Sequence, residues 1–342
     1  FVQQKYSYDY FIKKIETNLG LKINKKGEFS VSIFPTIHFI QNDLEISKTA
    51  KNLSFISREM ILEIVKEYRN LSKTKFKIYS PSTVINGIPL KNTTTKGIFQ
   101  NSNIKIINFF SNINEGKLLF QGDIKIENDI KVDINGSFEN ISLIRLLNQS
   151  RQIDWKRLTI KLRSNFNINS TGVGRIELIK NLSGNFPIKG LFYINSTQEE
   201  RFGTALLNIL TTKIPELSAI SKSLDFIFTK YADIPSQIEG LIVIEKGVIK
   251  TKELAIINNN AKMTVDMTYN IIEDDISGIL SFYDEEKIYL KTKLEGSINE
   301  PKILITGKPF SKNNIEEPLE DIKKIIEEGI TNIFQKLLES NN

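Results

Sequence analysis

The fold is decided by one stretch, residues 118–138, which reads LLFQGDIKIENDIKVDINGSF. Nearly all its even positions are apolar or glycine, and its odd positions from Gln121 to Ser137 are polar or charged. Side chains on a β-strand point alternately to the two faces of the sheet, so this period of two predicts one apolar and one solvated face. The break at Glu127-Asn128-Asp129 predicts a hairpin turn that keeps the parity on both sides.

The same pattern recurs along the chain. Even-numbered apolar residues return at Leu158, Ile160, Leu162, Phe166, Ile168, Ile176 and Leu178. Further strand signals cover residues 21–23, 29–33, 36–46, 238–244, 248–257, 261–269, 276–282, 288–294 and 302–306. The sequence therefore predicts a protein made mostly of long antiparallel strands.

Helices are predicted where apolar residues recur at helical spacing. They cover residues 8–19, 57–67, 141–148, 199–229 and 319–338, and Pro215 divides the fourth into a pair. Residues 70–105 are polar and contain Pro81, Gly87, Pro89 and Gly97, which predicts short strands and long turns. We therefore expect a mainly β (α+β) chain with flanking helices that are too few to cover every strand.

Composition excludes several classes of function. The 46 Lys and Arg and 40 Asp and Glu are interleaved, so the net charge of +6 forms no basic stripe and we expect no nucleic-acid partner. The absence of cysteine excludes disulfides, thiolate zinc sites and cysteine nucleophiles. No run of about 18 apolar residues predicts a membrane span within the sequence.

Motifs for catalysis are scarce. The single histidine, His38, lies in a predicted strand, where a satisfied or exposed side chain is expected. Gly172-Val173-Gly174 is followed by Arg175-Ile176-Glu177, interpreted as a strand, so a dinucleotide fingerprint fails on context. Asp274-Asp275 and Glu285-Glu286 sit beside turn signals and are interpreted as solvated charges. We predict no enzyme, no catalytic residue, no metal and no cofactor.

The apolar face is therefore the main functional signal. Leaving about eight large side chains of the hairpin in water forfeits on the order of 10–20 kcal/mol. A second sheet, the helices or a bound apolar ligand can each cover this face. The candidate residues are Phe120, Ile124, Ile126, Ile130, Val132, Ile134, Phe138, Ile160, Leu162, Phe166, Ile168, Met263, Val265 and Met267.

Three segments resemble the AsmA-like family of Gram-negative envelope proteins. The first joins the helix at residues 12–19 to Gly20-Leu21-Lys22-Ile23, Lys26-Gly27-Glu28-Phe29, Ile33-Phe34-Pro35 and Asp43-Leu44. The second is the Gly-bounded strand pair at residues 239–248, and the third is Leu294-Glu295-Gly296-Ser297-Ile298-Asn299-Glu300-Pro301 before the last helix. The segments occur in the family's order, and residues 70–115 contain no matching motif.

The resemblance implies a long curled antiparallel sheet that forms an apolar groove capped by helices. It divides the chain into an N-terminal AsmA-like region (1–115), a C-terminal AsmA-like curled sheet (116–310) with the helix pair 199–229, and a linker with an amphipathic helix (311–342). It also implies a periplasmic protein anchored to the inner membrane by a segment before Phe1.

The function implied by the resemblance is non-enzymatic. The family, related to chorein-type bridge-like lipid transfer proteins, is implicated in phospholipid transport and outer-membrane biogenesis, so the expected ligand is a phospholipid or another acyl-chain lipid. Envelope proteins are the other expected partners. The alternative is a structural or assembly scaffold of the envelope with a protein-filled β core.

Overall fold

The computed structural model describes residues 22–34, 36–50, 53–67, 70–143, 158–196, 226, 228–259, 261–284, 286–297 and 302–306. Of these residues, 79% lie in strands, so the chain is mainly β with few helices, as predicted. The strands pair in antiparallel fashion, and over the described residues the sheet is not closed. Within this part of the chain, no helix has the length and apolar character needed to cross a membrane.

The chain divides into two compact units. Unit 1 comprises residues 1–152 and 163–184, and unit 2 comprises residues 153–162 and 185–342. The boundary predicted between residues 115 and 116 lies inside unit 1, at the turn between two paired strands. Each unit is described by itself below.

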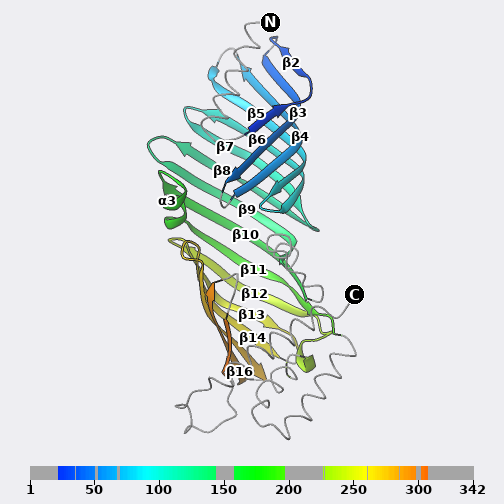
Figure 1. Cartoon of the computed structure of the whole chain (residues 1–342), viewed down its shortest axis with the longest axis vertical. Coiled ribbons are helices and arrows are strands. Elements are labelled where there is room, and N and C mark those ends of the chain that lie inside the picture. Colours follow the sequence, from blue (N-terminus) through cyan, green and yellow to red (C-terminus); the bar gives the residue numbers. More distant parts are fainter. Residues whose placement is uncertain are drawn as a thin grey trace. The chain divides into compact units, whose positions relative to one another are not determined.

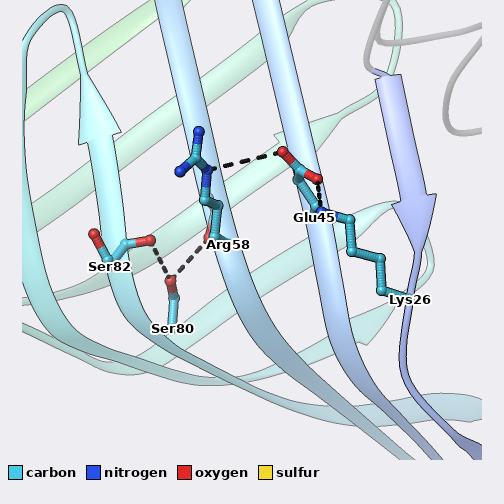
Figure 2. Close-up of polar contacts among 6 residues, drawn as sticks. Lys26, Glu45, Arg58, Ser80 and Ser82 are labelled. Atoms are coloured by element: carbon cyan, nitrogen blue, oxygen red, sulfur yellow. Dashed lines mark hydrogen bonds and ion pairs between the residues drawn. The ribbon is translucent and has the colours of Figure 1, made fainter.

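Unit 1 is a meander of long strands. Its strands are β1 (Lys22–Lys25), β2 (Phe29–Ser32), β3 (Ile37–Ala50), β4 (Leu53–Glu67), β5 (Asn70–Ile85), β6 (Ile88–Gln100), β7 (Asn103–Ile113), β8 (Gly116–Ile126) and β9 (Ile130–Ser142). From β3 to β9 each strand pairs with the next, and the short β1 and β2 both pair with β3. Figures 1 and 2 show β3 and β4 crossing in front of later strands of the unit at a steep angle, so this sheet is strongly curled.

The predicted hairpin at residues 118–138 is confirmed as β8 and β9. Leu118 pairs with Phe138 and Ile126 with Ile130, so even residues face even residues along the whole ladder. The turn falls at residues 127–129, as the sequence predicts. Along β9 the even positions are half-buried, and Lys131, Asp133 and Asn135 between them are exposed.

A line of β-bulges crosses unit 1. Asp43, Glu59, Asn92 and Asn140 lie within β3, β4, β6 and β9 and have positive φ angles of 45°, 53°, 52° and 53°. At β4, Arg58 and Glu59 both face solvent between the buried neighbours at positions 57 and 60. Each bulge adds one residue to its strand and bends it, so the inward positions change between odd and even numbers at the bulge while the inner face itself continues.

The helix predicted at residues 57–67 is wrong, because this segment is the strand β4. The bulge at Arg58–Glu59 turns Ser57 and Met60 to the same face, which gives a three-residue spacing typical of a helix. Beyond it, Leu62 and Ile64 return to a spacing of two and pair with Gln41 and Phe39 of β3.

The short strands and long turns predicted for residues 70–105 are also wrong. This segment contains β5 and β6, which are among the longest strands. They meet at Asn86-Gly87, with φ angles of 49° and 80°, a conformation in which Asn-Gly makes a two-residue hairpin turn. Asn101 and Ser102, with φ angles of 47° and 60°, form the next tight turn.

Two further strands have residues in both units: β10 (Leu158–Gly172) and β11 (Ser183–Ile194). The strand predicted for Arg175-Ile176-Glu177 is wrong, because these residues open the helix α3 (Arg175–Lys180). The Glu177 carboxylate accepts a 2.8 Å hydrogen bond from the backbone N–H of Val173 and so helps to start the helix. The predicted even-face positions Ile176 and Leu178 accordingly belong to no strand.

Unit 2 contains a second meander in which each strand pairs with the next. Its strands are β12 (Ser236–Glu245), β13 (Val248–Ile257), β14 (Lys262–Asn270), β15 (Asp275–Asp284), β16 (Lys287–Ser297) and β17 (Lys302–Thr306), close to the predicted ranges.

The interior of unit 2 is aromatic. The ring of Phe226 stacks on Tyr289 with centroids 4.7 Å apart, and its centroid lies 6.1 Å from that of Phe282 on β15. Tyr231 is 1% exposed and meets Phe192 edge to face at 6.1 Å. Burial raises the pKa of Tyr231, and its hydroxyl donates to the carbonyl of Ile256 at 3.4 Å.

Several predictions lie outside the described residues. They are the helices at 8–19 and 319–338, nearly all of the pair at 199–229 apart from the helical residues 226, 228 and 229, and the linker at 311–318. Of the helical turns predicted at residues 141–148, Ile141 and Ser142 instead end β9, and Leu143 is helical.

Candidate functional site

The inner face of unit 1 is apolar from strand to strand. One row of cross-strand partners runs from Phe39 through Ile64, Phe76, Gly97, Ile106 and Gly122 to Ile134. The next row runs through Gln41, Leu62, Ile78, Thr95, Phe109, Phe120 and Gly136. The large apolar side chains of both rows are half-buried. We call this surface, from β3 to β9 with the facing part of β10, the inner face.

Aromatic side chains pack along the inner face where glycines leave room. Phe109 stacks on Phe120 with centroids 4.1 Å apart, and the rings of Phe138 and Phe166 lie 6.3 Å apart. A Cβ atom at Gly136 would lie 2.6 Å from Cζ of Phe166, so only glycine fits beneath this ring. The inner face is therefore a packed apolar layer, with Phe166 of β10 against β9.

The opposite face of the same strands is polar. Lys75, Lys77, Lys96, Lys125 and Asp133 alternate with the inner residues, and all five are exposed. The outer face also carries the exposed apolar residues Ile61, Tyr79, Ile107 and Leu119, so it is mainly but not wholly polar. The alternation is the amphipathic pattern of a sheet with one solvated face.

The predicted site residues fall into two groups. In unit 1, the structure brings together Phe120, Ile124, Ile126, Ile130, Val132, Ile134, Phe138, Phe166 and Ile168 on β8, β9 and β10. In unit 2 lie Ile160 and Leu162 at the start of β10, and Met263, Val265 and Met267 on β14. The residues of β14 face one side as predicted, and Met263 pairs with Phe282 and is buried in the aromatic interior.

Sequence reasoning missed the part of the inner face on β4 to β7. Phe109 stacks on Phe120, and Ile104 pairs with Ile124, so β7 extends the predicted surface directly. The alternation of Lys75, Phe76, Lys77 and Ile78 in β5 is the signal that marks this extension.

A row of buried hydroxyl groups crosses the inner face at the line of bulges. Ser57 and Ser80 are 1% and 2% exposed, and their Oγ atoms lie 2.9 Å apart. Thr83 donates to Ser80 at 2.9 Å, and Ser80 donates to the carbonyl of Ser82 at 3.0 Å, as Figure 2 shows for the second bond. Further along the row, the hydroxyls of Thr93 and Ser111 are 2.9 Å apart. These buried groups are satisfied by one another.

Beyond the hydroxyl row, the inner face ends in a buried apolar cluster. Leu90, Ile113 and Ile141 form its centre, and Ile85, Ile88, Leu118 and Phe138 pack against it. The inner face is therefore graded along the strands, from half-exposed apolar residues through buried hydroxyls to a closed apolar cluster.

An ion network joins the strands at the same level on the outer face. Glu45 of β3 accepts from Lys26 Nζ at 2.6 Å, and its other oxygen lies 3.9 Å from Nε of Arg58 on β4 (Figure 2). The hydrogen bond and charge of Lys26 hold the pKa of Glu45 below its ordinary range, and Glu45 raises the pKa of Lys26. Through Lys26, the network links the connection between β1 and β2 to Glu45 on β3 and Arg58 on β4.

Two hollows lie among polar residues of unit 1. One, of about 590 Å³, is lined by Asn103, Asp123, Lys125, Lys131, Val132, Asp133, Asn169, Ser170, Thr171 and Asn181. The other, of about 470 Å³, is lined by Ile61, Glu63, Lys77, Tyr79, Thr94 and Lys96. Among their linings, only Val132 belongs to the predicted site.

The residues considered for catalysis have structural partners. His38 lies on β3, and its Nε2 is 2.9 Å from Oε1 of Glu63 on β4. Asp274 accepts hydrogen bonds from the hydroxyls of Tyr269 and Ser297 at 2.9 Å and 2.7 Å. Gly172-Val173-Gly174 does precede a helix, but position 177 holds glutamate where the dinucleotide fingerprint needs its third glycine.

No protein-family model matches the chain, and neither a curated protein nor a solved structure matches it.

The hydroxyl row yields a prediction about stability. Ser80→Ala removes one hydrogen-bond partner from each of the buried hydroxyls of Ser57 and Thr83, which still bond to each other at 3.1 Å, and should lower the free energy of unfolding by about 1–3 kcal/mol. Ser82→Ala, two residues away and exposed, should change it by less than about 0.5 kcal/mol, because only the backbone carbonyl of Ser82 is used. Urea unfolding followed by circular dichroism measures both.

A double-mutant cycle then tests whether the hydroxyls act together. The cost of Thr93→Val with Ser111→Ala should be smaller than the sum of the single costs, because the second change no longer leaves the buried hydroxyl of the other residue without its side-chain partner. Strictly additive costs would contradict the network.

The ion network yields a prediction about pH. The pKa of Glu45 is lowered in the folded protein, so its pairing adds stability above the ordinary pKa near 4.5 and loses it as the pH falls through the folded value. Glu45→Gln should therefore be less stable than wild type at neutral pH, and the difference should vanish in acid. Because Lys26 is largely exposed, we expect a small difference. A difference that is constant with pH, measured by urea unfolding, would contradict the assignment.

Proposed function

We propose that this chain is a non-enzymatic lipid-handling module whose inner face shields acyl chains. The observation that carries the proposal is the continuity of that face: half-buried apolar residues are cross-strand partners from Phe39 of β3 to Ile134 of β9. Apolar surface of this extent is stabilised by an apolar cover, and an acyl chain is a cover without polar groups to satisfy.

The charge distribution supports the same proposal. The outer side of β5 to β9 carries exposed lysines and aspartates, so the sheet keeps one face in water while the other meets the lipid. Acyl chains would lie along the apolar rows, with headgroups at the polar margin.

The resemblance of the sequence to AsmA-like envelope proteins gives this proposal its cellular setting. We propose that the chain acts in the periplasm of a Gram-negative bacterium, anchored to the inner membrane, in phospholipid transport or outer-membrane biogenesis. The proposed ligand is a phospholipid or another acyl-chain lipid, and envelope proteins are proposed partners.

The alternative is a scaffold with a protein-filled core, and one observation favours it. In unit 2, Met263 of the predicted lipid face is buried and pairs with Phe282 across β14 and β15. The ring of Phe226 packs against those of Phe282 and Tyr289 in the same unit. The inner face of unit 1 is therefore the place where the two functions differ.

Site-specific photocrosslinking separates them. A benzophenone side chain at Ile78 or Ile134 should give lipid adducts in cells, because both residues face inward. The same probe at Lys77 or Asn135, one residue away on the outer face, should give none. Equal labelling of both pairs, or no adducts at Ile78 and Ile134, would contradict the lipid proposal and support a filled core.

A matched pair of charged variants tests the same face by affinity. Ile134→Glu should reduce the lipid that co-purifies with the protein by about tenfold, because an unpaired carboxylate is costly beside an acyl chain. Asn135→Glu should leave the amount unchanged. Mass spectrometry of extracted lipid gives the ratio, and circular dichroism checks that both variants fold. Equal losses in the two variants would show that the faces are assigned wrongly.

A further inference from the structure

Apolar side chains are more exposed to solvent at one end of the unit 1 strands than at the other. In an antiparallel meander, alternate turns lie at the same end, so the β2–β3, β6–β7 and β8–β9 connections share one end. The connection that contains α3 lies there too, since Thr171 and Asn181 line one hollow with Lys131 at the tip of β9. We call this the α3 end; Figure 1 shows α3 on the left beside hairpin turns of the same unit.

Large apolar residues stand exposed at each of these connections. Their exposed fractions are 54% for Ile33, 84% for Phe34, 44% for Phe99, 44% for Ile126, 70% for Val173 and 65% for Ile176. They come from four connections that are distant in sequence, and the topology brings them to one end of the sheet.

The opposite end of the same strands buries its apolar residues. Beside the turns at residues 86–87 and 114–115, Ile85, Ile88 and Ile113 pack into the cluster around Leu90 and Ile141. Among the described residues, the apolar side chains beside these two turns are therefore better covered than those at the α3 end.

Basic residues surround the exposed tips. Lys75, Lys105, Lys125, Lys131, Arg175 and Lys180 lie at or near this end and are exposed. Glu127, Asp129 and Glu177 are the acidic residues in the same connections; Asp129 is 3.9 Å from Lys131, and Glu177 accepts from the backbone of Val173. Lys125 and Lys131 also line the 590 Å³ polar hollow, together with Asp123 and Asp133.

We propose that the α3 end of unit 1 is a membrane-docking rim that binds the surface of an anionic bilayer. Apolar side chains at several tips, with basic residues beside those at Phe99, Ile126 and Ile176, match the boundary between anionic headgroups and acyl chains. Phe34 and Ile176 insert at this boundary, and the lysines meet the phosphates. Because Phe99 and Ile126 continue the inner face to this end, the rim places that face against the membrane.

The rim does not depend on whether the inner face carries lipid. Vesicle binding tests the rim, and crosslinking at Ile78 and Ile134 tests the inner face, so either can fail alone. A rim without lipid adducts would describe a membrane-bound scaffold.

Vesicle sedimentation tests the rim directly. The purified chain should sediment with phosphatidylcholine vesicles that contain about a third phosphatidylglycerol, and binding should weaken as salt is raised. The combined variant Phe34→Ser, Ile126→Ser and Ile176→Ser should bind at least about tenfold more weakly. A control variant, Ile107→Ser with Leu119→Ser, removes apolar residues that are 50% and 37% exposed away from the α3 end, and should bind like wild type.

A tryptophan reporter locates the contact. With the single native tryptophan removed by Trp155→Phe, Phe34→Trp should show a blue-shifted emission on adding the anionic vesicles and quenching by brominated lipids. Leu119→Trp in the same background should show neither. The proposal is overturned if wild type does not sediment with these vesicles, if both serine variants lose binding equally, or if the Phe34→Trp reporter stays unquenched while the protein is bound.

Discussion

Unit 1 depends on one constraint, which is that inward residues pair only with inward residues in every ladder. Ile64 pairs with both Phe39 and Phe76, and Ile134 pairs with Gly122. A slip of one residue in any ladder would turn an apolar strand face into water and bring lysines such as Lys77 inside, so the register is strongly specified. The inner face exists because inward residues pair with inward residues in every ladder from β3 to β9.

The bulges bend the sheet and shift the inward positions between odd and even numbers, yet inward residues still pair with inward residues. They also account for the band of buried hydroxyls on the inner face. Where two residues turn outward together, the strands approach closely on the inside, and small side chains such as Ser57, Ser80 and Ser111 fill the space. Hydroxyls buried there need partners, which they find in one another. The outward pairs are free to carry charge, as Arg58 does beside Glu45. One backbone feature therefore explains the bend, the hydroxyl row and the ion network.

The sequence predicts the fold wherever a strand keeps an uninterrupted period of two. The hairpin at residues 118–138 and the strands of unit 2 were found for this reason, and so were the inward positions on β8 and β9. The pattern of residues 57–67 predicts a helix because a bulge produces the same three-residue spacing of buried side chains as a helical turn. The dipeptide Asn86-Gly87 is itself a signal for a two-residue hairpin turn. The polar residues around it nevertheless favour a prediction of long turns. Contacts such as Phe109 on Phe120 needed the register, which periodicity alone does not supply.

Isoleucine and phenylalanine occur at both ends of the unit 1 strands, and the hydrophobic effect has no direction of its own. At the end with the turn at Asn86, the sheet covers them; at the α3 end, Phe34 and Ile176 remain in water. Burying one such side chain fully is worth about 1.5–3 kcal/mol, so stability of the isolated chain does not favour the second arrangement. Apolar side chains are exposed in four separate connections at this end, which is consistent with a surface that another molecule covers. The inner face of unit 1 continues to the same end.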